Sequence, residues 1–131
     1  MTERSAYQIV ADHYAASARG DLPAMLADCA SDIRWTEAAG FPTAGTWVGV
    51  EQIVEHVFKP VGAAWDKFAF KLERLVDGGA TIVAIGGYSA LHRESHKPLD
   101  VRTVHVWDVA GGKIRRFEQF TDTLLVQRAA Q

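Results

Sequence analysis

The chain has 131 residues, of which 48% are hydrophobic and 23% are charged, and its formal net charge at pH 7 is −2. This length and composition predict one globular domain spanning residues 1–131. The scattered basic residues give no electrostatic footprint for nucleic acid, and a single cysteine, Cys29, excludes a disulfide framework. No segment approaches ~18 apolar residues and the N-terminus lacks the apolar run of a signal peptide, so we expect a cytoplasmic protein without a membrane partner.

The N-terminal region predicts two helices. Apolar residues recur at helical spacing over residues 5–19, and Gly20 ends this helix. Asp21 is a typical N-cap residue, and Pro23 suits the first turn of a second, shorter helix.

A strand and a loop follow these helices. Over residues 32–37 the alternation places Trp35 and Glu37 on the same face of a strand. Residues 38–49 are interrupted by glycines and a proline and are predicted to form a loop. Residues 38–47 of this loop are a candidate lid for a binding pocket.

A third helix is predicted over residues 50–58, with Pro60 and Gly62 ending it. From residue 68 onward the period of the apolar residues changes from 3.6 to 2, which is typical of strands. A long strand over residues 81–92 contains two glycines that indicate a bulge or bend.

Residues 101–123 predict a β-hairpin whose turn contains Gly111 and Gly112. Neither face of this hairpin is cleanly apolar or polar, whereas a sheet with one solvated face alternates plainly. Polar groups among aromatic residues therefore predict a lined cavity on one side of the hairpin and a subunit contact on the other. The whole order, two helices, a strand, a helix and then four strands, predicts an α+β fold.

Short motifs occur in order along nearly the whole chain. They are Tyr14 followed by Gly20-Asp21, then DIRW at residues 32–35, GTWVG at 45–49, GKI at 112–114 and DT at 122–123. With this element order, the chain resembles the nuclear transport factor 2-like superfamily, and most closely its SnoaL-like, ketosteroid-isomerase-related branch. The resemblance implies a cone-shaped, curved mixed β-sheet covered by three N-terminal helices, a cystatin-like roll. It also implies a deep apolar pocket and a homodimer formed through the outer sheet face.

The resemblance singles out Glu37 as a catalytic residue. Its spacing from Gly20-Asp21 and Asp32 matches the carboxylate that serves as proton-transfer base in ketosteroid isomerases. A carboxylate in an apolar pocket has a raised pKa, which suits it to accept a proton. The alternative is that Glu37 leaves the end of the strand into solvent.

His105 is the second catalytic candidate, because a neutral imidazole among aromatic residues can act as an acid or base. A Glu37–His105 pair across the pocket would form an acid/base couple. The alternative is a buried histidine that Gln119 or Glu37 satisfies. The positions of the isomerase oxyanion-hole residues hold His13 and Thr103, which argues against classical steroid isomerisation unless Tyr14 is recruited.

Three other chemistries are not expected. Asp122 is predicted to cap the C-terminal tail rather than to act as the acid/base residue of SnoaL-type cyclases. The positions of the Asp-Arg-Asp set of related epoxide hydrolases hold other residues. His92 and His96 straddle a strand end and a loop, so we expect no metal and no cofactor.

The sequence therefore predicts a cofactor-independent acid/base enzyme that isomerises, cyclises or dehydrates a hydrophobic carbonyl compound. Aromatic walls favour a flat or polycyclic apolar ligand. The predicted binding residues are Tyr14, Trp35, Phe58, Trp65, Tyr88, Thr103, Trp107, Phe117 and Gln119. Two alternatives remain open: a dimeric binding module without turnover, and a dimerisation domain with a vestigial pocket.

Overall fold

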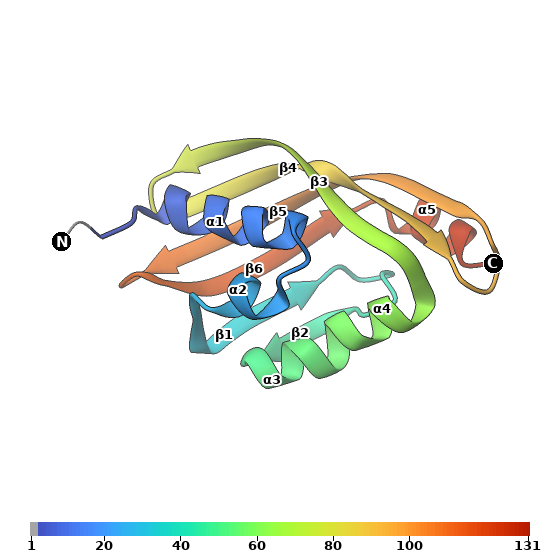
Figure 1. Ribbon diagram of the computed structural model, residues 1–131, viewed down its shortest axis with the longest axis horizontal. Coiled ribbons are helices and arrows are strands. Elements are labelled where there is room, and N and C mark those ends of the chain that lie inside the picture. Colours follow the sequence, from blue (N-terminus) through green and yellow to red (C-terminus); the bar gives the residue numbers. More distant parts are fainter. Residues whose placement is uncertain (1–2) are drawn as a thin grey trace.

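The computed structural model describes residues 3–131 and has the mixed α+β fold that the sequence predicts, with helices packed on a curved sheet (Figure 1). The helices are α1 (Ala6–Ala18), α2 (Leu22–Leu26), α3 (Val50–Ile53), the π-helix η1 (Val54–Phe58), α4 (Lys59–Ala64) and α5 (Thr123–Ala129). The strands are β1 (Cys29–Glu37), β2 (Gly45–Val48), β3 (Trp65–Gly78), β4 (Thr81–His92), β5 (Pro98–Ala110) and β6 (Lys113–Thr121). None of these helices is long and apolar enough to cross a membrane, within the described residues.

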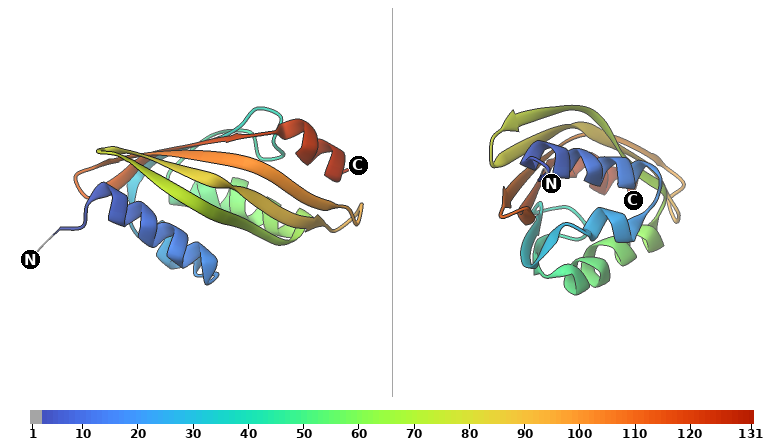
Figure 2. Two further views of the ribbon diagram at one scale, coloured as in Figure 1. Left: turned by 90° about the horizontal axis from the view of Figure 1, so that it is seen from above. Right: turned by 60° about the vertical axis from the view of Figure 1, so that its left-hand side comes forward.

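The six strands form one sheet in the order β2-β1-β6-β5-β4-β3. Neighbouring strands are antiparallel except β1 and β6, which are parallel. Because β2 and β3 are the two edges, the sheet curves without closing. The right-hand view of Figure 2 shows α1 and α2 inside this curve, with the α3–α4 segment along its lower side.

The N-terminal helices form as predicted. The Ser5 hydroxyl caps α1 by accepting from the backbone N–H of Gln8, and the Asp21 carboxylate caps α2 in the same way. Gly20 adopts φ +69° between them, a conformation that a residue without a Cβ tolerates best. The buried side of α1 includes His13 and Tyr14, so both side chains face the sheet.

Residues 38–49 are not a loop throughout, because β2 pairs antiparallel with β1. Trp47 lies opposite Trp35, and the hydroxyl groups of Thr36 and Thr46 are 2.9 Å apart. The glycines on both sides of this four-residue strand obscure its signal, since they mark its ends rather than a continuous loop.

The third helix does not end at Phe58 as predicted but continues through η1 and α4 to Ala64. In η1 the backbone N–H of Lys59 bonds the carbonyl of Val54, five residues earlier, which widens the turn. This widening accommodates Pro60 in the first turn of α4, where its missing N–H and its ring do not break the helix.

The β5–β6 hairpin is confirmed, with Gly111 and Gly112 at positive φ in its turn. Strict alternation along residues 113–121 would place Ile114 on the opposite face from Phe117, and the structure departs from this alternation. A register shift after Asp108 leaves Arg115 without a register partner on β5, so that both Ile114 and Phe117 point inward although they lie three positions apart. Strict alternation places Ile114 on the wrong face for this reason.

Candidate functional site

A cavity of about 530 Å³ lies between the sheet, α1, α2 and the η1–α4 segment. This volume is in the range of sites that bind small molecules. Of the predicted site residues, the cavity is lined by Glu37, His105, Tyr14, Trp35, Phe58, Trp65, Tyr88, Phe117 and Gln119.

Two predicted binding residues do not line the cavity. Thr103 is buried in the sheet, where its hydroxyl lies 3.0 Å from that of Thr121. Trp107 lies behind Tyr14 and donates its Nε1–H to the Tyr14 hydroxyl at 2.9 Å. Both are buried on the inner face of β5, as alternation predicts, but Tyr14 of α1 covers Trp107 and the Thr103 hydroxyl bonds within the sheet.

Several lining residues were missed by the sequence analysis. They are His13, Met25, Phe41, Val57, Phe68 and Phe70. Phe68 and Phe70 alternate along β3, so the pattern shows that they share a face but not which face turns inward. Phe41 follows β1 in an irregular segment, where the sequence carries no periodicity to read.

Glu37 is buried at the end of β1, with only 4% of its surface exposed. It lies inside because β1 alternates, so that Ile33, Trp35 and Glu37 all face the core. Its carboxylate accepts hydrogen bonds from Thr43 Oγ1 at 2.9 Å and Trp35 Nε1 at 3.2 Å. Burial raises the pKa of Glu37 to about 7, and the two hydrogen bonds oppose that rise.

The segment between β1 and β2 covers Glu37 and is held by α5. The backbone carbonyl of Gly40 accepts a hydrogen bond from Gln127 Nε2 at 3.0 Å. Gly40 also has no room for a side chain, because a Cβ there would lie 2.7 Å from Thr123 Oγ1. Asp122 caps α5, as predicted, by accepting from the backbone N–H of Leu125. The C-terminal helix thereby fixes the segment that positions Thr43.

His105 lies at the centre of a buried chain of hydrogen bonds. Its Nδ1 is 2.7 Å from the Tyr14 hydroxyl and its Nε2 is 2.7 Å from the Tyr88 hydroxyl. Gln119 Nε2 donates to Tyr88 at 2.8 Å, while Gln119 Oε1 accepts from the backbone N–H of Ala38. The partners of His105 are thus two tyrosines, rather than the Gln119 or Glu37 that the sequence suggests.

The hydrogen-bonded groups around His105 have one more hydroxyl hydrogen than they have acceptors. Burial, and to a lesser degree the charge of His13, keeps the pKa of His105 well below its usual value, so the ring is neutral. A neutral imidazole donates through one nitrogen and accepts through the other. It therefore accepts from one tyrosine and donates to the other. The second tyrosine already accepts from Trp107 or Gln119, and its own O–H has no acceptor among residues 3–131.

Electrostatics distinguish Glu37 from the other ionisable groups of the cavity. Burial raises the pKa of Tyr14 and Tyr88 well above 10, and it lowers the pKa of His13 to about 4. The nearby Glu37 charge adds to the rise at Tyr88. Glu37 alone in this set exchanges a proton near neutral pH, which is the requirement for a general base.

No group of three or more His, Cys, Asp or Glu side chains in residues 3–131 is arranged to hold a metal ion. His92 Nδ1 accepts a hydrogen bond from the backbone N–H of Ser95, which places it in a turn.

Residues 10–117 match the family described as SnoaL-like domain, and the chain therefore belongs to this family. It is similar to an NTF2-like protein from Burkholderia thailandensis, with 54% identity over 98% of each chain and a TM-score of 0.96. No curated protein sequence matches the chain.

More distant solved structures share the fold. One is described as a putative SnoaL-like polyketide cyclase from Jannaschia, with 17% identity over 99% of this chain and 97% of that one and a TM-score of 0.81. Another is TerC co-crystallized with polyporic acid, with 20% identity over 95% and 97% of the two chains and a TM-score of 0.85.

Proposed function

We propose that this protein is a cofactor-independent acid/base enzyme that moves a proton beside the carbonyl group of a hydrophobic small molecule. Glu37 is the base, and Tyr88 is the hydrogen-bond donor to the carbonyl oxygen. The observation that carries the proposal is the position of Glu37, a carboxylate with a pKa raised to about 7 that lines an aromatic cavity.

Tyr88 is assigned as the donor because of the charge on Glu37. When Glu37 is ionised, its negative charge acts on Tyr88. This charge favours the arrangement in which Tyr88 carries the hydroxyl hydrogen that has no acceptor in the protein. In that arrangement Tyr14 donates to Nδ1 of His105, and Nε2–H donates to the Tyr88 oxygen. The Tyr88 O–H is then available to a ligand, and His105 positions it rather than serving as the partner acid.

The reaction follows from these two groups. The Glu37 carboxylate removes a proton from the carbon next to the carbonyl, and the electrons of the C–H bond form the C=C bond of an enolate. The negative charge on the enolate oxygen is stabilised by the Tyr88 hydrogen bond. Where a second C=C bond is conjugated with the enolate, return of the proton from Glu37 to the far carbon of that system isomerises the molecule. Alternatively, the enolate carbon attacks a second carbonyl of the same molecule, and the alkoxide that forms takes the proton from Glu37, so that the molecule is cyclised and the carboxylate is restored. The aromatic walls support a flat ligand, and TerC, which was co-crystallized with polyporic acid, provides a related example.

Exchange of carbon-bound hydrogen tests this step without knowledge of the natural substrate. Aromatic and alicyclic ketones are incubated with the protein in D₂O, and loss of the proton signal next to the carbonyl is followed by NMR. We expect exchange with wild type, a loss of at least ~100-fold in Glu37→Gln and a smaller loss in Tyr88→Phe. Glu51→Gln, which changes an exposed carboxylate in the first turn of α3, is the matched control.

Exchange that survives Glu37→Gln would contradict the proposal. Binding of the ketones without exchange would favour the alternative function, a small-molecule-binding module that performs no turnover. Ligand binding is read independently from the shift in melting temperature, because a ligand that binds only the folded state stabilises it.

We further propose that the chain forms a homodimer through the outer face of the sheet. Phe120, which pairs in register with Val104, is 49% exposed on this face, and Val104 and Val106 are only half-buried. Apolar side chains grouped on one face are typical of a protein contact. Light scattering should give a dimer for wild type and a monomer for Phe120→Glu, and a monomeric wild type would refute the proposal.

A further inference from the structure

We propose that the substrate carries an anionic group, such as a carboxylate, at the end opposite its reacting carbonyl, and that Lys67 and Arg93 bind this group at the cavity mouth. The inference rests on the proposed function, which places the carbonyl beside Tyr88. It adds the chemical class of the substrate, a hydrophobic carbonyl acid.

The mouth of the cavity is identified by lining residues that are also exposed. They are Ala18, Gly20, Gly62, Lys67, Ala69 and Arg93. These residues come from the end of α1, from α4, from the beginning of β3 and from the segment after β4. Glu37, Tyr88 and His105 are instead buried, so the acid/base groups and the mouth lie at different depths of the cavity.

The negative and positive side chains of the lining also lie at different depths of the cavity. Glu37 is the buried charged residue, whereas Lys67 and Arg93 supply two positive charges at the mouth. Arg93 has one loose ionic neighbour, Asp66 at 3.8 Å, and both side chains are about half exposed. Within residues 3–131, Lys67 has no ion-pair partner within 4.0 Å. Both cations are therefore accessible to an anionic group on a ligand.

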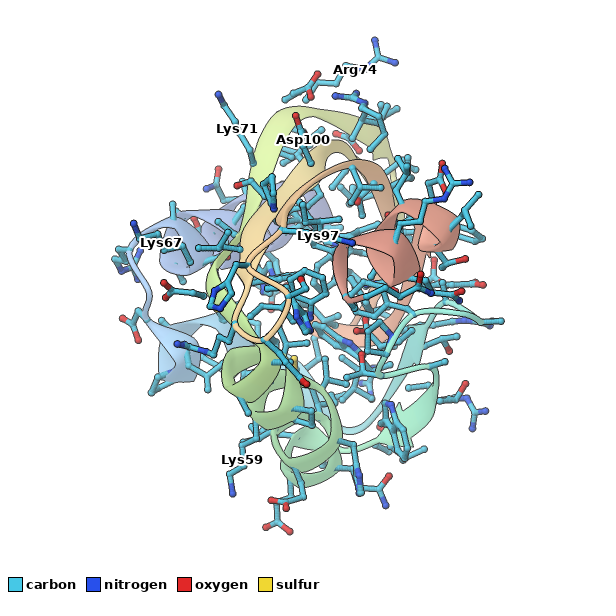
Figure 3. The ribbon with its side chains drawn as sticks, turned by 90° about the vertical axis from the view of Figure 1, so that its right-hand side faces the viewer. Lys59, Lys67, Lys71, Arg74, Lys97 and Asp100 are labelled. Atoms are coloured by element: carbon cyan, nitrogen blue, oxygen red, sulfur yellow. The ribbon has the colours of Figure 1, made fainter. Side chains whose placement is uncertain are left out.

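The backbone at Lys67 is held in an unusual conformation. Its φ is +54°, in the left-handed region that a residue with a side chain rarely adopts. The strand register shifts between Asp66 and Ala69, so Lys67 lies in a bulge of β3. Bulges redirect side chains and occur often beside functional sites, and backbone strain at such a position points to a function. Figure 3 shows Lys67 beside the ribbon of the N-terminal helices, whereas Lys71 of the same strand projects away from the molecule.

Apolar side chains make up most of the remaining lining of the cavity. Trp65, Phe68 and Phe70 contribute from β3, and Leu22 and Met25 contribute from α2. A ligand that reaches from Tyr88 to the mouth therefore has an apolar body with polar groups at both ends. Because the outer end meets two cations, the polar group there is an anion rather than an amine.

Matched pairs of ligands test this inference. The probes are phenyl ketones that carry a terminal carboxylate on an alkyl chain of increasing length, together with their methyl esters. Affinity is measured by titration calorimetry on wild type, Lys67→Met, Arg93→Met and the double variant. Lys71→Met removes an exposed lysine of β3 that does not line the cavity, and serves as the control.

We expect one chain length at which wild type binds the acid roughly 5- to 20-fold more tightly than its ester at low ionic strength, because two exposed charge contacts are gained. Each single variant should reduce this preference, the double variant should abolish it without weakening ester binding, and Lys71→Met should keep it. High salt should reduce the preference, since exposed charges are screened.

Equal binding of acid and ester at every chain length, or a preference that persists in the double variant, would overturn the inference. So would a failure of both acids and esters to bind. Hydrogen exchange separates the two proposals. Acid preference without hydrogen exchange supports anion binding by Lys67 and Arg93 and refutes the proposed enzyme activity. Hydrogen exchange without acid preference supports the enzyme activity and refutes anion binding at the mouth.

Discussion

Replacing Glu37 with glutamine should stabilise the folded protein much more at pH 8 than at pH 5. The reason is the cost of holding an ionised carboxylate in a buried cavity. The pKa of Glu37 is raised from 4.5 to about 7 in the folded protein. Below pH 4.5 both folded and unfolded chains are protonated at this site, so Glu37 has no effect on the pH dependence of stability.

Between pH 4.5 and 7 the unfolded chain releases this proton while the folded chain retains it, so the contribution of Glu37 to the free energy of unfolding falls as pH rises. Above pH 7 both states are ionised and the loss is complete. At ~1.36 kcal/mol per pKa unit the full loss is about 3 kcal/mol. Glutamine does not ionise, so the stability difference between Glu37→Gln and wild type should grow over this range and then become constant.

Urea denaturation of both proteins from pH 5 to 8.5 measures this difference. The difference matters more than either curve, because His13 and His105 have lowered pKa values and make both proteins less stable as the pH falls below 6.5. Glu51→Gln, which changes an exposed carboxylate, is measured alongside as the matched control. A constant difference across the whole range, or a Glu37→Gln protein that is less stable than wild type at pH 8, would refute the reasoning that Glu37 has a raised pKa.

Three substitutions test the packing around the cavity, each by urea denaturation. Tyr14→Phe should destabilise the protein by about 1–3 kcal/mol, because a buried nitrogen of His105 and Nε1 of Trp107 both lose their partner. Gly86→Ala should cost about 3 kcal/mol, because its Cβ would lie 2.1 Å from the carbonyl oxygen of Lys71. Gly62→Ala should stabilise by about 0.5–1 kcal/mol, because it is a helical glycine with open space around its Cβ position. Unchanged stability in Tyr14→Phe or Gly86→Ala would contradict the contacts described for these residues. A loss of stability in Gly62→Ala would contradict the open space at that position.

The sequence alone predicts the helices that its caps and periodicity define, and the hairpin that its two glycines close. It also predicts that Trp35 and Glu37 share a face, because alternation in a strand is a local property. These signals depend on residues that are close together in the chain. For this reason α1 and the β5–β6 hairpin match their predictions.

The local signals fail where a single extra residue changes the geometry. The bulge at Arg115 reverses the expected face of Ile114, and the wide turn of η1 carries the helix past Pro60. Short-range patterns do not reveal such irregularities, because long-range pairing and packing stabilise them.

The partners of the candidate catalytic residues depend entirely on tertiary structure. His105 contacts Tyr14, 91 residues away in the chain, and Tyr88, 17 residues away, and it does not bond the carboxylate of Glu37. The sequence determines that these polar groups lie on inward faces. Only the curvature of the sheet and the packing of α1 against it decide which of them meet, which hydroxyl keeps a free hydrogen, and why the pKa of Glu37 is raised. The physical reason is that burial and hydrogen-bond partners are set by the whole fold, whereas periodicity is set by the neighbouring residues.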